Sequence, residues 1–193
     1  ASDGKLYNAA AYLEKGKVVH IQRKIYHWEL STQTIPFQQA SEILPFDTQF
    51  GKLGILIGED AEHIIHHHLL ALQQAQLIIS PAALPISGLH SEALPESLQK
   101  RSFKNQAAAR LNSVALAFAN RIGNENGFSF GGKSEIWNAW GNLAGEAPVM
   151  EENLLTAQIS LDEALQAQKL NKSLITEKPE IALQAWKRLQ QPL

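Results

Sequence analysis

Residues 51–60 have the sequence GKLGILIGED, and this stretch decides the fold. A Gly-Lys pair leads into a short apolar run at residues 53–57, which ends at Gly58. Short apolar runs bounded by glycine are typical of buried strands in an α/β sheet. Because helix-compatible sequence begins at Ala61, Gly58 is predicted at a strand-to-helix corner, where ligands bind in such folds. The N–H groups at this corner suit a nucleophile with an oxyanion site beside it, but glycine has no side chain that attacks.

The composition is that of a globular protein. The chain has 193 residues, of which 45% are hydrophobic and 19% charged, and we expect a single domain over residues 1–193. A net charge of −2 gives no electrostatic case for nucleic acid, and no apolar run approaches the roughly 20 residues that span a bilayer. Cysteine is absent, which excludes disulfides, thiolate metal sites and cysteine nucleophiles within this sequence. Without disulfides or a secretory signal pattern, a cytoplasmic location is expected.

Strands and helices alternate along the chain. We expect a hairpin from strands 6–13 and 18–21, a long loop at 25–40, strands at 43–46, 53–57, 77–79 and 114–119, and helices at 61–75 and 92–112. A turn-rich loop is predicted at 120–127, followed by strands at 128–130, 134–137 and 154–159 and helices at 161–169 and 180–189. Alternation favours a sheet covered by helices, and the late strands favour antiparallel additions, hence a mixed sheet.

Six short segments point to one family because of their order. They are GKLYN at residues 4–8, RKIY at 23–26, LIGEDA at 56–61, LIISPA at 77–82, ANRIG at 119–123 and FGGKS at 130–134, and a Trp-Gly turn follows at 140–141. In this order they resemble the carbon–nitrogen hydrolase (nitrilase) superfamily along most of the chain. The resemblance implies a four-layer αββα sandwich with mixed sheets, in the α/β class, and it implies no cofactor or metal.

The resemblance also implies a chemistry. Members of the superfamily use a Glu–Lys–Cys triad to hydrolyse or condense amides and nitriles through a thioester-type intermediate. The thiolate attacks a carbon bonded to nitrogen, a carboxylate moves the proton, and an ammonium stabilises the developing oxyanion. By the matching motifs, the family's lysine falls on Lys24 and its cysteine on Gly58.

The two glutamates of the family's site have no matching glutamate in this sequence. The auxiliary glutamate falls on Gln33, seven residues before Ala40, which replaces the family's glycine; Glu29 would substitute only if the loop alignment shifted. The first glutamate belongs to an N-terminal portion that this sequence is expected to lack. Of the reacting groups only Lys24 remains, and a lysine without a nucleophile binds an oxyanion or a carboxylate but does not run the reaction.

The absent N-terminal portion also bears on partners. The sequence begins at Ala1 rather than methionine, which indicates a processed or truncated product. In the family that portion supplies the first strands and a helix, so without it strand edges and apolar faces would be exposed. We therefore expect association with itself, as a homodimer or higher oligomer, or with a chain that supplies the strands. A small amide or carboxylate is the expected ligand, with no nucleic acid or membrane as partner.

Residues around the corner have two interpretations. Glu59 and Asp60, assigned with Pro81 to a binding cleft, also suit the first turn of a helix, where carboxylates cap free N–H groups. His63 and His67 are spaced to share a helix face, as zinc ligands do, but no third ligand is evident. A half-buried or interface histidine run is the simpler interpretation. If the helix packs on a partner chain, the run would make association sensitive to pH near 6.5.

Three functional hypotheses follow. The first is a degenerate amidase-like protein, with Gly58 at the nucleophile position, that serves as a binding or structural subunit. The second is a carbon–nitrogen hydrolase whose cysteine was mutated or lost. The third is a hydrolase that uses another nucleophile or a histidine-bound metal, although the chain has no G-x-S-x-G elbow.

Overall fold

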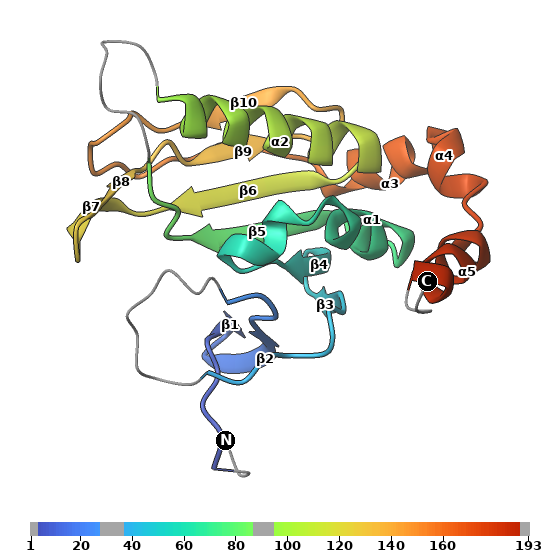
Figure 1. Cartoon of the computed structure of the whole chain (residues 1–193). Coiled ribbons are helices and arrows are strands. Elements are labelled where there is room, and N and C mark those ends of the chain that lie inside the picture. Colours follow the sequence, from blue (N-terminus) through green and yellow to red (C-terminus); the bar gives the residue numbers. More distant parts are fainter. Residues whose placement is uncertain (1–3, 28–36, 87–94, 190–193) are drawn as a thin grey trace.

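The computed structural model describes residues 4–27, 37–86 and 95–189 (Figure 1). The elements follow one another along the chain. They are β1 (Ala9–Glu14), β2 (Lys17–Arg23), β3 (Phe46–Thr48), β4 (Gly51–Ile55), the 3-10 helix η1 (Gly58–Glu62), α1 (Ile64–Leu72), β5 (Leu77–Ala82), α2 (Glu96–Asn112), β6 (Ala115–Asn120), β7 (Ile122–Glu125), β8 (Phe128–Gly131), β9 (Glu135–Trp137), β10 (Leu143–Glu146), α3 (Leu161–Leu170), α4 (Lys172–Ile175) and α5 (Pro179–Leu189).

A six-stranded mixed sheet forms the centre, in the order β10-β9-β6-β5-β4-β3. The three inner strands β4, β5 and β6 are parallel, and β3, β9 and β10 are antiparallel additions. Helices α1 and α2 cover one face of this sheet (Figure 1). The mixed α/β class is therefore confirmed.

The contact between β4 and α1 depends on a glycine. A Cβ at Gly54 would stand 2.7 Å from a methyl carbon of Leu70, so a larger residue there would force the Leu70 side chain of α1 to move. Leu70, Ile78 and Val114 are fully buried beside it. The apolar run that ends at the corner thus forms the centre of the core.

The N-terminal hairpin forms a second, two-stranded sheet. Its inner side contacts the main sheet through Phe46 of β3, on which the His20 ring stacks at 4.2 Å and against which Tyr12 packs. Its outer side leaves Leu13 and Ile21 more than half exposed. Of the four layers expected, the described residues form the helical layer over the main sheet, the sheet itself, and this hairpin.

Several predicted boundaries are wrong. Residues 154–159 pair with no strand, and Leu155 packs on Gly145 of β10 instead. Sequence analysis did not predict β10, which pairs with β9. The predicted loop at 120–127 contains β7, which pairs with β8. The strand predicted at 43–46 begins at Phe46, since the preceding Pro45 has no N–H for a ladder. The predicted helix 61–75 is divided at His63, whose backbone is extended.

Side-chain amides tie the C-terminal helices to the sheet. The Gln76 amide accepts from the N–H of Lys52 and donates to the carbonyl of Leu161, at 2.8 and 2.9 Å. Gln168 of α3 donates to the carbonyl of Ala75 at 2.7 Å. The helices predicted at 161–169 and 180–189 are confirmed as α3 and α5. No helix within the described residues is long and apolar enough to cross a membrane.

Candidate functional site

The strand-to-helix corner lies where β4 leads into η1. Gly58, the first residue of η1, is buried and has a φ of +52°, in the left-handed region that favours glycine. A Cβ built on Gly58 would stand 3.6 Å from the ammonium nitrogen of Lys24, which lies just beyond the end of β2. The fold therefore brings together the two positions onto which the triad's lysine and cysteine were mapped.

Asp60 holds the two chain segments of the corner together. Its carboxylate is only 1% exposed and accepts hydrogen bonds from the N–H groups of Ile25, at 3.2 Å, and Tyr26, at 2.9 Å. These residues directly follow Lys24, so Asp60 attaches the lysine's segment to the turn that begins at Gly58. Glu59 and Asp60 lie in the first turn of η1, as the alternative interpretation expected, but the acceptor oxygens of Asp60 bind a segment about 35 residues earlier instead of N–H groups of its own helix.

The other predicted site residues are placed less centrally. Glu59 is half-buried, and its Oε2 is buried without a hydrogen-bond partner among the described residues. Pro81 is part of β5 and pairs with Ala119 of β6, so it belongs to the sheet. Gln33 and Glu29 lie outside the described residues.

The histidine run is packed against the same corner. The Tyr26 ring stacks on His63 at 3.9 Å and on His66 at 5.5 Å, and Nδ1 of His66 is 2.7 Å from the carbonyl oxygen of Asp60. His63 precedes α1, so the predicted face shared with His67 is wrong. Within the described residues no group of three or more His, Asp or Glu is arranged to hold a metal ion.

Burial sets the titration of two of these histidines. Burial lowers the pKa of His67 to about 4, and the charge of neighbouring His66 adds to the effect. Burial also lowers the pKa of His66, against a hydrogen bond that the ring donates to the backbone carbonyl of Asp60, which raises it. Both pKa values therefore lie below the ordinary value of 6.5, and the pH sensitivity of association stays a prediction.

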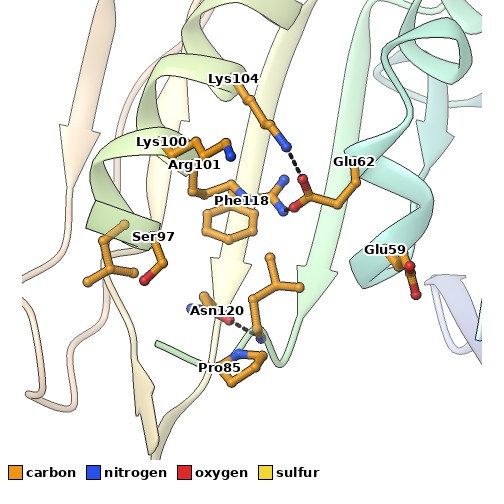
Figure 2. Close-up of a pocket in the computed structure, with 11 residues that line it drawn as sticks. Glu59, Glu62, Pro85, Ser97, Lys100, Arg101, Lys104, Phe118 and Asn120 are labelled. Carbon is orange, nitrogen blue, oxygen red and sulfur yellow. Dashed lines mark hydrogen bonds and ion pairs between the residues drawn. The ribbon is translucent and has the colours of Figure 1, made fainter. Parts of the chain in front are cut away.

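A pocket of about 400 Å³ opens beside the corner, between η1, α2 and the carboxyl ends of β5 and β6 (Figure 2). Its polar lining comes mainly from Glu59, Glu62, Ser97, Lys100, Arg101, Lys104 and Asn120, and its apolar lining from Leu84, Pro85, Leu98 and Phe118. Sequence analysis placed a cleft at these strand ends but missed the contribution of α2. The only signal there was the grouping of cations one turn apart, which is also typical of a solvated helix face.

Asn120 and Glu135 shape the frame of this pocket. The Asn120 side chain accepts from the N–H of Leu84 and donates to the carbonyl of Gly132, each at 3.0 Å. Glu135 of β9 is 1% exposed and accepts from Asn105 of α2 at 2.9 Å. Burial raises the pKa of Glu135, but hydrogen bonds from Lys133, Ser102, Asn105 and Trp137 outweigh it and hold the pKa below its ordinary value. The pocket wall formed by α2 is thus anchored to the sheet.

Residues 1–169 match the family model described as carbon-nitrogen hydrolase. The chain belongs to the carbon–nitrogen hydrolase family. It is 27% identical over 160 residues to a probable nitrilase of Schizosaccharomyces pombe, with 82% of this chain and 55% of the relative covered. It is also 27% identical over 165 residues to a glutamine-dependent NAD(+) synthetase of Aquifex aeolicus, with 82% and 27% covered. The chain thus spans about half or less of the length of these curated relatives.

Solved structures of this family share the fold. A carbon–nitrogen hydrolase from Helicobacter pylori G27 superposes with a TM-score of 0.85 at 23% identity, over 96% of this chain and 68% of that one. An amidase from Nesterenkonia sp. superposes with a TM-score of 0.70 at 22% identity, over 89% and 57%. Within this carbon–nitrogen hydrolase fold, the chain carries glycine at its strand-to-helix corner and no cysteine in its 193 residues.

Proposed function

We propose that this member of the carbon–nitrogen hydrolase family has lost thiol chemistry and acts as a binding or structural subunit. The observation that supports this most directly is the corner itself, where Lys24 faces a residue without a side chain. An ammonium at this place stabilises negative charge on a bound oxygen, but the covalent step needs an electron pair from a nucleophile. The amidase of Nesterenkonia sp. AN1, by contrast, has an active-site cysteine.

The proposal predicts that the protein does not release ammonia from amides. We expect no turnover of glutamine, acetamide or a nitrile above the rate of the K24M variant, measured by a coupled ammonia assay. The proposal is overturned if the unmodified protein releases ammonia and the K24M variant does not. Such activity would require a nucleophile other than the residue at 58.

Restoring the thiol tests the geometry of the corner. In the G58C variant we expect the new thiol to react rapidly with iodoacetamide, with a thiol pKa of about 7.5 or below, because the Lys24 ammonium favours the thiolate. The double variant G58C/K24M is the matched control and should react like an ordinary thiol. We expect no amide turnover from G58C, since Gln33 occupies the auxiliary glutamate position; turnover would instead show that only the cysteine had been lost.

The exposed face of the hairpin supports the structural part of the proposal. Leu13, Val19 and Ile21 lie on its outer side, and this apolar surface is available for another copy of the chain. In sedimentation velocity at micromolar concentration we expect a species heavier than the 21.3 kDa monomer. I21K should shift it toward the monomer, whereas I175K, at an exposed position of α4, should not. A monomer that unfolds cooperatively would contradict self-association.

A further inference from the structure

Arg101 lines the pocket, and its guanidinium has an unused hydrogen-bond donor. The side chain is 7% exposed, lies over the ring of Phe118 and pairs through Nη2 with Glu62. Its other terminal nitrogen, Nη1, is buried without a hydrogen-bond partner among the described residues. Because buried N–H groups in native proteins are almost always paired, an unpaired one on a side chain that lines a pocket points to a ligand that supplies an acceptor.

The charges around this donor favour an anion. Lys100, Arg101 and Lys104 bring three positive charges to the pocket, and Glu59 and Glu62 bring two negative ones, which leaves an excess of one positive charge. Glu62 is shared between Arg101 and Lys104, so neither cation is fully neutralised. Burial lowers the pKa of Arg101 to about 10, against the charge of nearby Glu135, which raises it, and the guanidinium stays protonated at neutral pH. Glu135 does not line the pocket and is paired with Lys133 at 2.9 Å. The site is suited to a single negative charge, because the two glutamates would repel a dianion such as phosphate.

The rest of the wall is apolar. Leu84 and Pro85 follow β5, and the buried side chains of Phe118 of β6 and Leu98 of α2 also line the pocket. Phe118 lies against Arg101 (Figure 2). A ligand that fills the pocket must therefore place an anionic group on α2 and an apolar body against these side chains. A volume of about 400 Å³ lies within the range of small-molecule sites.

We propose that this pocket binds a small organic monocarboxylate, whose carboxylate accepts from Nη1 of Arg101 and from the Lys100 ammonium, and whose apolar body packs on Phe118, Leu84 and Pro85. Planar carboxylates suit guanidinium donors, and charge-assisted hydrogen bonds in a partly buried site are strong. Neither Lys24 nor Gly58 lines the pocket, so the inference holds whether or not the chain hydrolyses amides.

Titration calorimetry with benzoate and hexanoate tests the proposal, with benzamide and hexanamide as neutral probes of the same shape. We expect the carboxylates to bind at least tenfold more tightly than the amides, and more tightly than inorganic phosphate. In R101M carboxylate binding should weaken tenfold or more, whereas R110M, farther along the same helix and outside the pocket lining, should bind as the unmodified protein does.

Two further variants keep the test decisive if R101M does not fold. E62Q removes the competing carboxylate and should tighten benzoate binding several-fold, and K100M should weaken it. Equal affinity for benzoate and benzamide, no binding of either carboxylate at millimolar concentration, or unchanged affinity in both E62Q and K100M would each overturn the proposal.

Discussion

Replacing Asp60 with alanine is expected to lower the free energy of unfolding by about 3 kcal/mol, because the change leaves the N–H groups of Ile25 and Tyr26 without their acceptor. Asp60 is 1% exposed, so water does not readily replace the carboxylate. The same bonds hold the segment of Lys24 against the Gly58 turn. We therefore expect the thiol of G58C/D60A to react more slowly with iodoacetamide than the thiol of G58C. Urea unfolding monitored by tryptophan fluorescence measures the first effect.

Two matched variants distinguish the role of Asp60 as a hydrogen-bond acceptor from a general effect of removing a carboxylate. D60N keeps one acceptor oxygen and should lose about 1 kcal/mol, since the side chain still accepts from at least one of the two N–H groups. D47A, at an exposed position of β3, should change the stability by less than about 0.5 kcal/mol. If D60A and D47A have the same unfolding midpoint, the assigned role of Asp60 is wrong.

The second large effect expected is a loss of stability in acid that depends on His67. The folded pKa of His67 is about 4 and its ordinary value is 6.5, so the unfolded chain binds the proton more readily than the folded one. The contribution of neutral His67 to the free energy of unfolding is therefore complete above pH 6.5 and is lost as the pH falls toward 4. Each pKa unit corresponds to about 1.4 kcal/mol, so the loss is on the order of 3 kcal/mol. The lowered pKa of His66 acts in the same direction.

Urea unfolding at pH 7, 5.5 and 4.5 measures this dependence. H67Q cannot gain the proton, so its unfolding free energy should depend less on pH than that of the unmodified protein, whatever its absolute stability. H68Q is the matched control on the same helix, where His68 is partly exposed and contacts Asn112 and Glu177. An equal slope of stability against pH in the unmodified protein and in H67Q would show that His67 is not the group that titrates.

The predictions that succeeded rest on patterns local in the chain. The hairpin at β1 and β2, the strand before Gly58, helix α3 and the mixed sheet are each indicated by neighbouring residues, namely turn chemistry, apolar runs bounded by glycine, and helical spacing. The wrong predictions concern what a segment pairs with. Residues 154–159 have an alternating pattern suited to a strand, yet Leu155 packs on β10 and the segment pairs with no strand. Whether a segment joins a sheet depends on which sheet edge is free to pair with it, and this is decided by residues that are distant in the sequence.

The sequence by itself determined the class of fold, the corner at residue 58 and the absence of a thiol, because these follow from residue identity and short-range order. Only the tertiary structure decided which groups meet there: Lys24 reaches Gly58, Asp60 binds a segment about 35 residues earlier, and Arg101 enters a pocket with an unpaired donor. The physical reason is that such contacts depend on burial and on chain crossings, which place residues distant in sequence within hydrogen-bond reach and determine which polar groups are satisfied.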